Sequence, residues 1–230
     1  DRLWKKTRKP SSPDCYGSDP DRNWGFRWNH TGVSNPCAED YPGKSAFSEI
    51  EMMTMAHYIS NLNFYAYVSF HGYGQRLGFP FSYTDSHSFI NYEELYRVGT
   101  AAVVALKQVH GTTYYTGCLG EISPWGLASG SSIDYVAGAL FKNVTFRYQM
   151  RDKLTFLLPP NQIIPTGEEI ISSLINMFNK ISNKQLYKQL NDCRNILKSY
   201  NCKSNFYYLI LIFINFLILI FTITLCLYLF

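Results

Sequence analysis

The sequence predicts an α/β fold, a sandwich built on a mostly parallel or mixed β-sheet. Two observations support this class. Strands are predicted at the short apolar run 64–70 and at 143–149, and amphipathic helical patterns occur at 46–62, 92–109 and 166–190. Strands that alternate with helices are typical of α/β proteins. The chain of 230 residues is long enough to bury the core of one domain of ordinary size.

Residues 46–62 are predicted to form the first helix, after a loop-like segment over 1–45 that is rich in Pro, Gly, Ser, Asn and Asp. Serines precede the helical pattern as candidate caps, and acidic residues stand in its first turn. One set of apolar side chains recurs at helical spacing and is expected to face the core: Ile50, Met53, Ala56 and Ile59.

The next elements place two polar residues at strand ends. The continuous apolar run 64–70 suits a strand buried on both faces, and His71 follows it at once. After the helix over 92–109 come a glycine-rich loop, a short helix from Ser132 and a strand that ends at Gln149. Ligands of α/β sheets bind at the carboxyl ends of strands, so His71 and Gln149 are candidate site residues.

The charge, the cysteines and the glycosylation tripeptides indicate the kind of partner and the compartment of the protein. The net charge of +4 is a mild excess without a Lys/Arg block on a recognisable helix, which argues against a nucleic-acid partner. Cys15 and Cys37 flank a polar loop, and their spacing fits a disulfide better than a zinc site. Two glycosylation acceptor tripeptides begin at Asn29 and Asn143. We therefore expect a secreted protein, or one on the extracellular face of a membrane.

The last 25 residues differ from the rest. Residues 206–230 are almost entirely apolar, and a helix of this length spans roughly 37 Å, enough to cross a bilayer core of about 30 Å. We expect a membrane anchor, with two alternatives open: a cleaved lipid-anchor signal, or a tail that is not native. Residues 183–205, rich in Asn, Lys and Tyr, are expected to be a polar linker after a domain over 1–182.

Several motifs in a preserved order resemble one enzyme family, the zinc metallocarboxypeptidases of the A/B type. They are Asp-Arg-Leu-Trp-Lys-Lys-Thr-Arg at 1–8, Cys-Tyr-Gly-Ser-Asp-Pro-Asp-Arg-Asn-Trp at 15–24, Ser-Phe-His-Gly-Tyr-Gly-Gln at 69–75, Ala-Ser-Gly-Ser-Ser-Ile-Asp at 128–134 and Arg-Asp at 151–152, followed by Phe-Leu-Leu-Pro at 156–159 and Gln-Ile-Ile-Pro-Thr at 162–166. Pro36-Cys37 continues the match and supplies the disulfide partner of Cys15.

The resemblance implies a three-layer α/β/α sandwich with a mixed sheet. It also implies removal of a C-terminal residue from a peptide by zinc-activated water, with a carboxylate as the base. An Arg would stabilise the oxyanion, and a second Arg would bind the terminal carboxylate. The partners implied are the C-termini of peptides or proteins.

The chain departs from this pattern at the catalytic positions. His71 matches the third zinc ligand of the family, but the His-x-x-Glu motif that supplies the other two is absent from residues 1–230. We therefore expect the catalytic domain to be truncated at its N-terminus, where the chain starts at Asp1 without a signal-peptide pattern. Gln149 stands at the position of the catalytic Glu, and an amide cannot take a proton from water at neutral pH.

Substrate-binding positions are kept in part. Arg22 matches the Arg that anchors the terminal carboxylate, whereas Asp21 replaces the neighbouring Asn and Lys5 replaces the carbonyl-polarising Arg. An added carboxylate beside a bound carboxylate is repulsive unless Arg22 neutralises it. Tyr73, in the motif of His71, is assigned to substrate binding.

The residues expected in the pocket for the substrate side chain predict two different preferences. Ile133 stands where the family selects the substrate side chain, and its apolar character resembles the A-type preference. Arg147 is expected to face the same pocket through strand alternation, which would favour an acidic side chain. The pocket Tyr of the family has no clean match, and Gly126 lies nearest to its position, beside Trp125.

Three functions remain open at the level of sequence. The first is a zinc carboxypeptidase of which this chain is a part, and the second is a non-catalytic protein that binds peptide C-termini. The third is a non-functional or mis-assembled product. Residues 1–230 by themselves are predicted to be inactive, and to be poorly soluble because truncation would expose new sheet edges.

Overall fold

The computed structural model describes residues 3–86, 91–152 and 155–199, with side chains through residue 182. Residues Asp1–Ile181 form one compact unit, and Ser182–Phe230 form a second. Five α-helices and four strands lie within the described residues: α1 Ile50–Ser60, β1 Ala66–His71, β2 Arg76–Phe79, α2 Tyr92–His110, β3 Tyr115–Cys118, α3 Leu119–Ile122, α4 Ser132–Gly138, β4 Val144–Gln149 and α5 Ile163–Ser199, with a 3-10 turn at Pro160–Gln162 before α5.

The four strands form one mixed sheet in the order β1-β4-β2-β3. Strand β1 pairs with β4 in parallel, β4 pairs with β2 antiparallel, and β2 pairs with β3 in parallel. The predicted mixed sheet is therefore confirmed. Because β1 and β4 run in the same direction, their carboxyl ends meet at one edge of the sheet.

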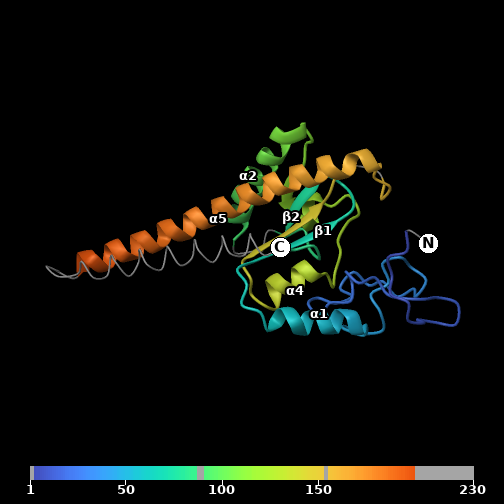
Figure 1. The fold of residues 1–230 in the computed structure, drawn as a ribbon. Helices are drawn as coiled ribbons and strands as arrows, with labels where there is room; N and C mark the ends of the chain where they lie inside the picture. Colours follow the sequence, from blue (N-terminus) through green and yellow to red (C-terminus); the bar gives the residue numbers. More distant parts are fainter. Residues whose placement is uncertain (1–2, 87–90, 153–154, 200–230) are drawn as a thin grey trace, which may run out of the picture. The chain divides into compact units, whose positions relative to one another are not determined.

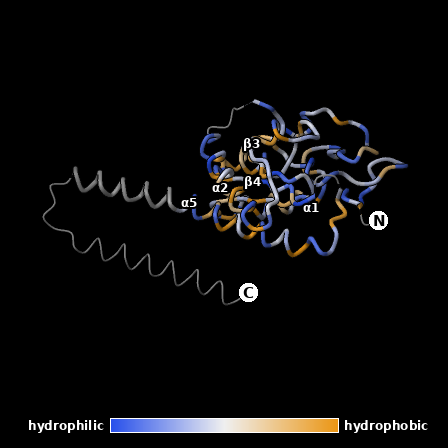
Figure 2. The backbone as a smooth tube through the Cα atoms, turned by 90° about the horizontal axis from the view of Figure 1, so that it is seen from above, coloured by the Kyte–Doolittle hydropathy of each residue, from blue (hydrophilic) through white to orange (hydrophobic). Residues whose placement is uncertain are grey.

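Helices cover both faces of this sheet (Figure 1). Helix α2 and the part of α5 before Ser182 pack on one face, over a core that includes Leu77, Phe79, Phe146 and Tyr148. Figure 2 shows hydrophobic segments gathered around α2 and β4. Helices α1 and α4 lie on the other face, where Trp24 packs with Ala56, Ile59 and Val136. The layers within residues Asp1–Ile181 are therefore helix, sheet and helix.

Helix α2 follows its sequence pattern closely. Its buried residues include the predicted Leu95, Val98, Ala102 and Leu106. It ends at Gly111, whose φ of 78° is the left-handed conformation that terminates helices and that glycine adopts without strain. The predicted helix over 92–109 is thus confirmed, as are the short helix from Ser132 and the strand that ends at Gln149.

The prediction of which side chains of α1 face the core is confirmed for two residues and wrong for the other two. Ala56 and Ile59 are buried, but Ile50 is 62% exposed and Met53 is 48% exposed. The helix is apolar on two sides, so spacing alone did not select the face that packs. Its inner face is instead completed by Met52, which contacts the cluster around Trp24.

Strand β1 is not buried on both faces as expected. Its residues are half-buried, and Phe70 is 47% exposed. The physical reason is position in the sheet: β1 stands at the end of the strand order and pairs with β4 on one side. An apolar run does not reveal whether a strand is central or terminal.

Two short strands were not predicted. The segment expected to be a glycine-rich loop contains β3, Tyr115–Cys118, and the four-residue helix α3, Leu119–Ile122. Strand β2 also has only four residues, Arg76–Phe79. Elements of this length hold too few residues for a hydrophobic period to be recognised.

The polar linker expected from residue 183 begins within α5, which continues to Ser199. Residues 206–230, for which a membrane anchor is expected, lie outside the described residues. In the described part of the chain, no helix combines the length and apolar character needed to cross a membrane.

A disulfide joins Cys15 to Cys37, as predicted. The bond closes a loop with a sequence separation of 22 residues in the irregular N-terminal segment. Cys15 itself is 7% exposed. The segment that carries Asp21 and Arg22 lies between the two cysteines, so the disulfide restricts its conformational freedom.

Candidate functional site

The site lies at the carboxyl ends of β1 and β4. His71 and Gln149 are direct partners in the parallel register of the two strands, and Ser69 pairs with Arg147 two residues earlier. Side chains on a strand alternate between faces, so these residues share one face of the sheet. That face is turned toward α4 rather than toward the apolar core under α2.

This polar face contains unused hydrogen-bonding groups. Seven buried side-chain nitrogen and oxygen atoms in the described part of the chain have no hydrogen-bond partner, and five of them lie here. They belong to Ser69, Thr145, Arg147, which contributes Nε and Nη2, and Gln149. Buried polar atoms are normally satisfied by protein, water or ligand. The face is therefore suited to a polar ligand or to ordered water.

Asp21 is held against this face from the N-terminal segment. Its Oδ1 accepts hydrogen bonds from the backbone N and the Oγ of Ser132, both at 3.0 Å. Its Oδ2 lies 2.7 Å from Nη2 of Arg147 and 3.6 Å from Nη1 of Arg22. Asp21 thus joins the strand face, the start of α4 and the neighbouring Arg22.

These contacts keep Asp21 ionised. Burial by itself raises the pKa of its carboxyl, but Arg147, His71 and Arg22 together with the Ser132 hydrogen bond lower it to about 2. His71 behaves differently, because burial lowers the pKa of its imidazole and outweighs the opposite influence of Asp21. The site therefore combines an ionised carboxylate with a histidine that favours the neutral form.

Helix α4 is positioned by its own N-terminus. Ser131 caps it by accepting a hydrogen bond from the backbone N of Asp134, and Ser132 and Ile133 follow the cap. Gly130, just before, has a φ of 68°, and an added Cβ would stand 2.2 Å from the backbone O of Arg22. A glycine is required there, because the two chain segments approach too closely for a side chain.

Asp134 ties α4 to the loop after β2. Its carboxylate accepts hydrogen bonds from the backbone N and Oγ of Ser82, at 2.7 to 3.1 Å, and from the backbone N of Tyr83. Burial raises the pKa of Asp134 to about 6, although the Ser82 hydrogen bonds act in the opposite direction. Ile133 beside it is fully buried.

Lys5 lies in a separate ion pair. Its Nζ is 3.0 Å from Oδ2 of Asp19, a carboxylate that also accepts a hydrogen bond from the backbone N of Asp21. The Lys5 side chain is 45% exposed. The structure thus gives this cation a buried carboxylate as its partner and links it to Asp21 through the Asp19 turn.

Aromatic side chains surround Tyr73. Its ring contacts those of Trp125 and Phe156, with centroids 5.4 and 4.7 Å apart. An added Cβ on Gly74 would meet both Trp125 and the Oε1 of Gln149. The aromatic group therefore stands next to Gln149.

The residues present do not fit a zinc site. In the described residues, no group of three or more His, Cys, Asp or Glu side chains is placed to hold a metal ion. A catalytic zinc normally takes three protein ligands, and His71 supplies one nitrogen. The described residues by themselves therefore do not complete the ligand set that a catalytic zinc requires.

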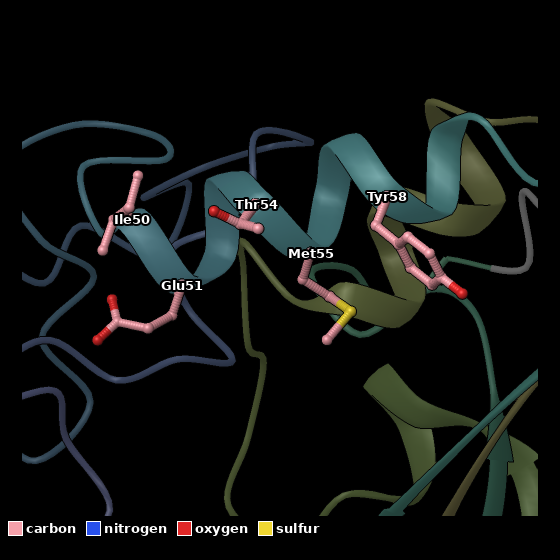
Figure 3. Close-up of a pocket in the computed structure, with 5 residues that line it drawn as sticks. All are labelled: Ile50, Glu51, Thr54, Met55 and Tyr58. Atoms are coloured by element: carbon pink, nitrogen blue, oxygen red, sulfur yellow. The ribbon is translucent and has the colours of Figure 1, made fainter.

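A hollow lies on the surface of α1, and Figure 3 draws the side chains that line it. It is about 420 Å³ in volume, and all its lining residues come from this one helix. The lining residues are Ile50, Glu51, Thr54, Met55 and Tyr58. This surface lacks the convergent polar groups that a catalytic site needs.

Several site residues were not predicted from the sequence. Ser132 and Asp19 orient Asp21 and Lys5, and Tyr67 lies near Ser132, with the pKa of its phenol raised by burial. Strand alternation places Tyr67 on the face of His71 and could have identified it. No pattern in the sequence indicates that Ser132 and Asp21 meet.

The comparison with known protein families shows which family the chain belongs to. The family model described as zinc carboxypeptidase matches residues 1–173. The chain belongs to the zinc carboxypeptidase family. It is 41% identical to zinc carboxypeptidase A 1 of Anopheles gambiae over 196 residues, and 40% identical to carboxypeptidase A1 of Bos taurus over 173 residues.

Solved carboxypeptidase structures show the same fold. Bovine thrombin-activatable fibrinolysis inhibitor, in complex with tick carboxypeptidase inhibitor, superposes with a TM-score of 0.71 at 34% identity. This match covers 80% of the chain and 64% of that structure. The predicted α/β sandwich of the carboxypeptidases is confirmed.

The chain spans less than half the length of several of these relatives. The matched region covers 82% of the chain but 44% of the Anopheles gambiae protein, and 73% of the chain but 40% of the bovine one. Activities of whole carboxypeptidases therefore extend to this chain as proposals.

Proposed function

We propose that this chain binds the C-termini of peptides at the Asp21–Arg22 segment without hydrolysing them by its own residues. The observation that carries the proposal is the pair of guanidinium groups around Asp21 on the polar face. Arg22 and Arg147 converge on Asp21 at the carboxyl ends of β1 and β4, next to His71 and Gln149. Carboxylate recognition by guanidinium groups uses strong charge-assisted hydrogen bonds.

Arg22 is the residue best suited to a terminal carboxylate. Its side chain is 23% exposed, and it lies 3.6 Å from Asp21 Oδ2, beyond the distance of a strong hydrogen bond. Its Nη1 donates to the backbone O of Asp21. The remaining donors of the guanidinium can serve a ligand, since the planar group carries five N–H donors.

Gln149 supports a function without hydrolysis. It occupies the end of β4 opposite His71 and is 9% exposed. Its amide can donate and accept hydrogen bonds, but it cannot act as a general base for water. A buried amide at this position can orient a bound peptide.

A second candidate function is hydrolysis of C-terminal residues by a longer protein that contains this chain. Family membership over residues 1–173 favours it, and so does the position of His71 at a strand end. Zinc would then be held by His71 together with ligands from outside the 230 residues. The disulfide is consistent with a secreted protein, because such bonds persist in oxidising compartments.

The test compares a fluorescent peptide with a free C-terminal carboxylate and the same peptide with a C-terminal amide. The chain is expected to bind the free carboxylate about tenfold more tightly, because the charge-assisted hydrogen bonds are lost with the amide. Arg22→Ala removes this difference. Arg97→Ala, which changes an Arg of α2 paired with Glu94, leaves it intact.

Mass spectrometry of the same peptides, incubated with the chain and added zinc, tests the absence of hydrolysis. The expected result is an intact peptide. Equal affinity for acid and amide would overturn the binding proposal. Enzymatic release of the last residue by residues 1–230 would contradict both the proposed absence of hydrolysis and the need for zinc ligands from outside these residues.

A further inference from the structure

The ion pair between Asp21 and Arg147 has a consequence for substrate choice. Arg147 is 6% exposed and projects from β4 toward the start of α4, on the face that carries Gln149. Asp21 reaches it from a segment far away in the sequence, and the shorter contact is 2.7 Å. The side chains of Arg147 and Asp21 are 7% and 18% exposed, so the pair is costly to separate because either charge alone would be poorly solvated.

Arg147 faces negative charge on two sides. Asp21 lies in direct contact, and Asp134 on α4 interacts with it electrostatically. The positive charge of the guanidinium is thus neutralised from within the protein. An Arg left unpaired in the same place would attract an acidic side chain, whereas the paired Arg147 offers such a side chain no net attraction.

The hydrogen-bond donors of Arg147 are not all used. Nη2 lies close to Asp21 Oδ2, but its N–H groups are not aligned for a hydrogen bond, and Nε also has no partner. A buried donor without an acceptor is unfavourable. A neutral acceptor on a ligand, such as the side-chain amide oxygen of Gln, can satisfy these donors without bringing in a second carboxylate.

We propose that Asp21 is a specificity-determining residue that neutralises Arg147, so that the site takes peptides ending in a neutral residue in preference to an acidic one. This inference rests on the proposed binding of peptide C-termini at Arg22. It assigns opposite parts to the two arginines: Arg22 receives the terminal carboxylate, and Arg147 contacts the last side chain without attracting negative charge. The buried Ile133 next to Ser132 is compatible with a neutral side chain.

The experiment uses two peptides that differ only in a C-terminal Gln or Glu. The two side chains have nearly the same shape, so the ratio of their dissociation constants reports charge. The full chain is expected to bind the Gln peptide about tenfold more tightly. Asp21→Asn uncovers Arg147 and reverses the preference, to about tenfold in favour of the Glu peptide, while Asp21→Asn with Arg147→Gln removes this preference for Glu and brings the ratio close to one.

Arg147→Gln alone supplies a second, independent measurement in case Asp21→Asn fails to fold. This variant leaves Asp21 without its close partner, so affinity for both peptides falls and Glu is disfavoured further. Circular dichroism melting establishes folding of each variant. If the ratio of the dissociation constants for the Gln and Glu peptides is unchanged in both folded single variants, the inference about Asp21 is overturned, while the proposed binding of peptide C-termini still stands. No preference of the unmodified chain for free carboxylate over amide would instead show that the proposed function itself had failed.

Discussion

The surroundings of Asp21 and Asp134 shift the pKa values of these two carboxyls in opposite directions. Burial raises the pKa of both, but Arg147 and its neighbours lower that of Asp21 to about 2. Asp134 has hydrogen-bond donors as its close partners, and its pKa rises to about 6. A nearby guanidinium therefore compensates for desolvation more fully than neutral donors do.

The raised pKa of Asp134 predicts a pH-dependent stability. The folded state holds this proton more tightly than the unfolded state, so the stabilisation is present below pH 3.8 and is lost as the pH rises to about 6. Asp134→Asn should abolish a loss of about 2 kcal/mol between pH 4 and pH 7, as measured by urea unfolding at these two pH values.

The comparison between the original chain and this variant removes the contribution of His71, whose lowered pKa acts in the opposite direction. The stabilisation from Asp21 is present above pH 3.8 and is lost only as the pH falls to about 2, outside the range measured. An identical pH dependence in the original chain and the Asp134→Asn variant would contradict the assignment.

At the scale of elements, one ion pair fastens α5 to the end of β4. Arg151 lies just after β4, and its Nη2 is 2.5 Å from Oε1 of Glu169, which is fully buried in α5. The guanidinium also donates to Gln162 and to Thr112. This cluster fixes the helix that covers one face of the sheet.

Glu169→Gln is expected to lower the free energy of unfolding by about 3 kcal/mol, because it leaves the charge of Arg151 without a buried counter-charge. Glu168→Gln is the matched control, since Glu168 is 54% exposed and pairs with His110. The control should cost less than about 1 kcal/mol. Urea unfolding of both variants at pH 7 measures the difference, and equal losses would rule out the assigned role of the buried pair.

At the scale of the molecule, apolar surface is unevenly distributed. Helix α1 exposes Ile50, Met53, Met55 and Tyr58, at 48% to 62%. Strand β1 beside it in the chain stands at the end of the described sheet. Exposed apolar patches and strand edges promote association between molecules.

We therefore expect the chain to self-associate through this surface. Replacing Met55 and Tyr58 by Lys should raise the fraction of monomer measured by size-exclusion chromatography with light scattering. Gln108→Lys on α2, which adds charge elsewhere, is the control and should change little. A monomeric, sharply melting preparation of the original chain would refute both this prediction and the expected poor solubility.

Much of the fold could be predicted because it is encoded locally. The period of α2, the short helix from Ser132 and the apolar strand before His71 depend on residues close in sequence. The same holds for the strand ends that bring His71 and Gln149 to one edge. The exposed face of α1 and the terminal position of β1 could not be predicted, because they depend on which elements pack nearby.

The sequence by itself determined the family, the α/β class, the Cys15–Cys37 disulfide and the identity of the side chains at the strand ends. Only the tertiary structure decided how those side chains are paired. In the structure, Arg147 forms an ion pair with Asp21, and Lys5 forms one with Asp19. From the sequence, the pocket that contains Arg147 could favour either an apolar or an acidic substrate side chain. Ion pairs between distant segments depend on long-range packing and on desolvation, which no local pattern records.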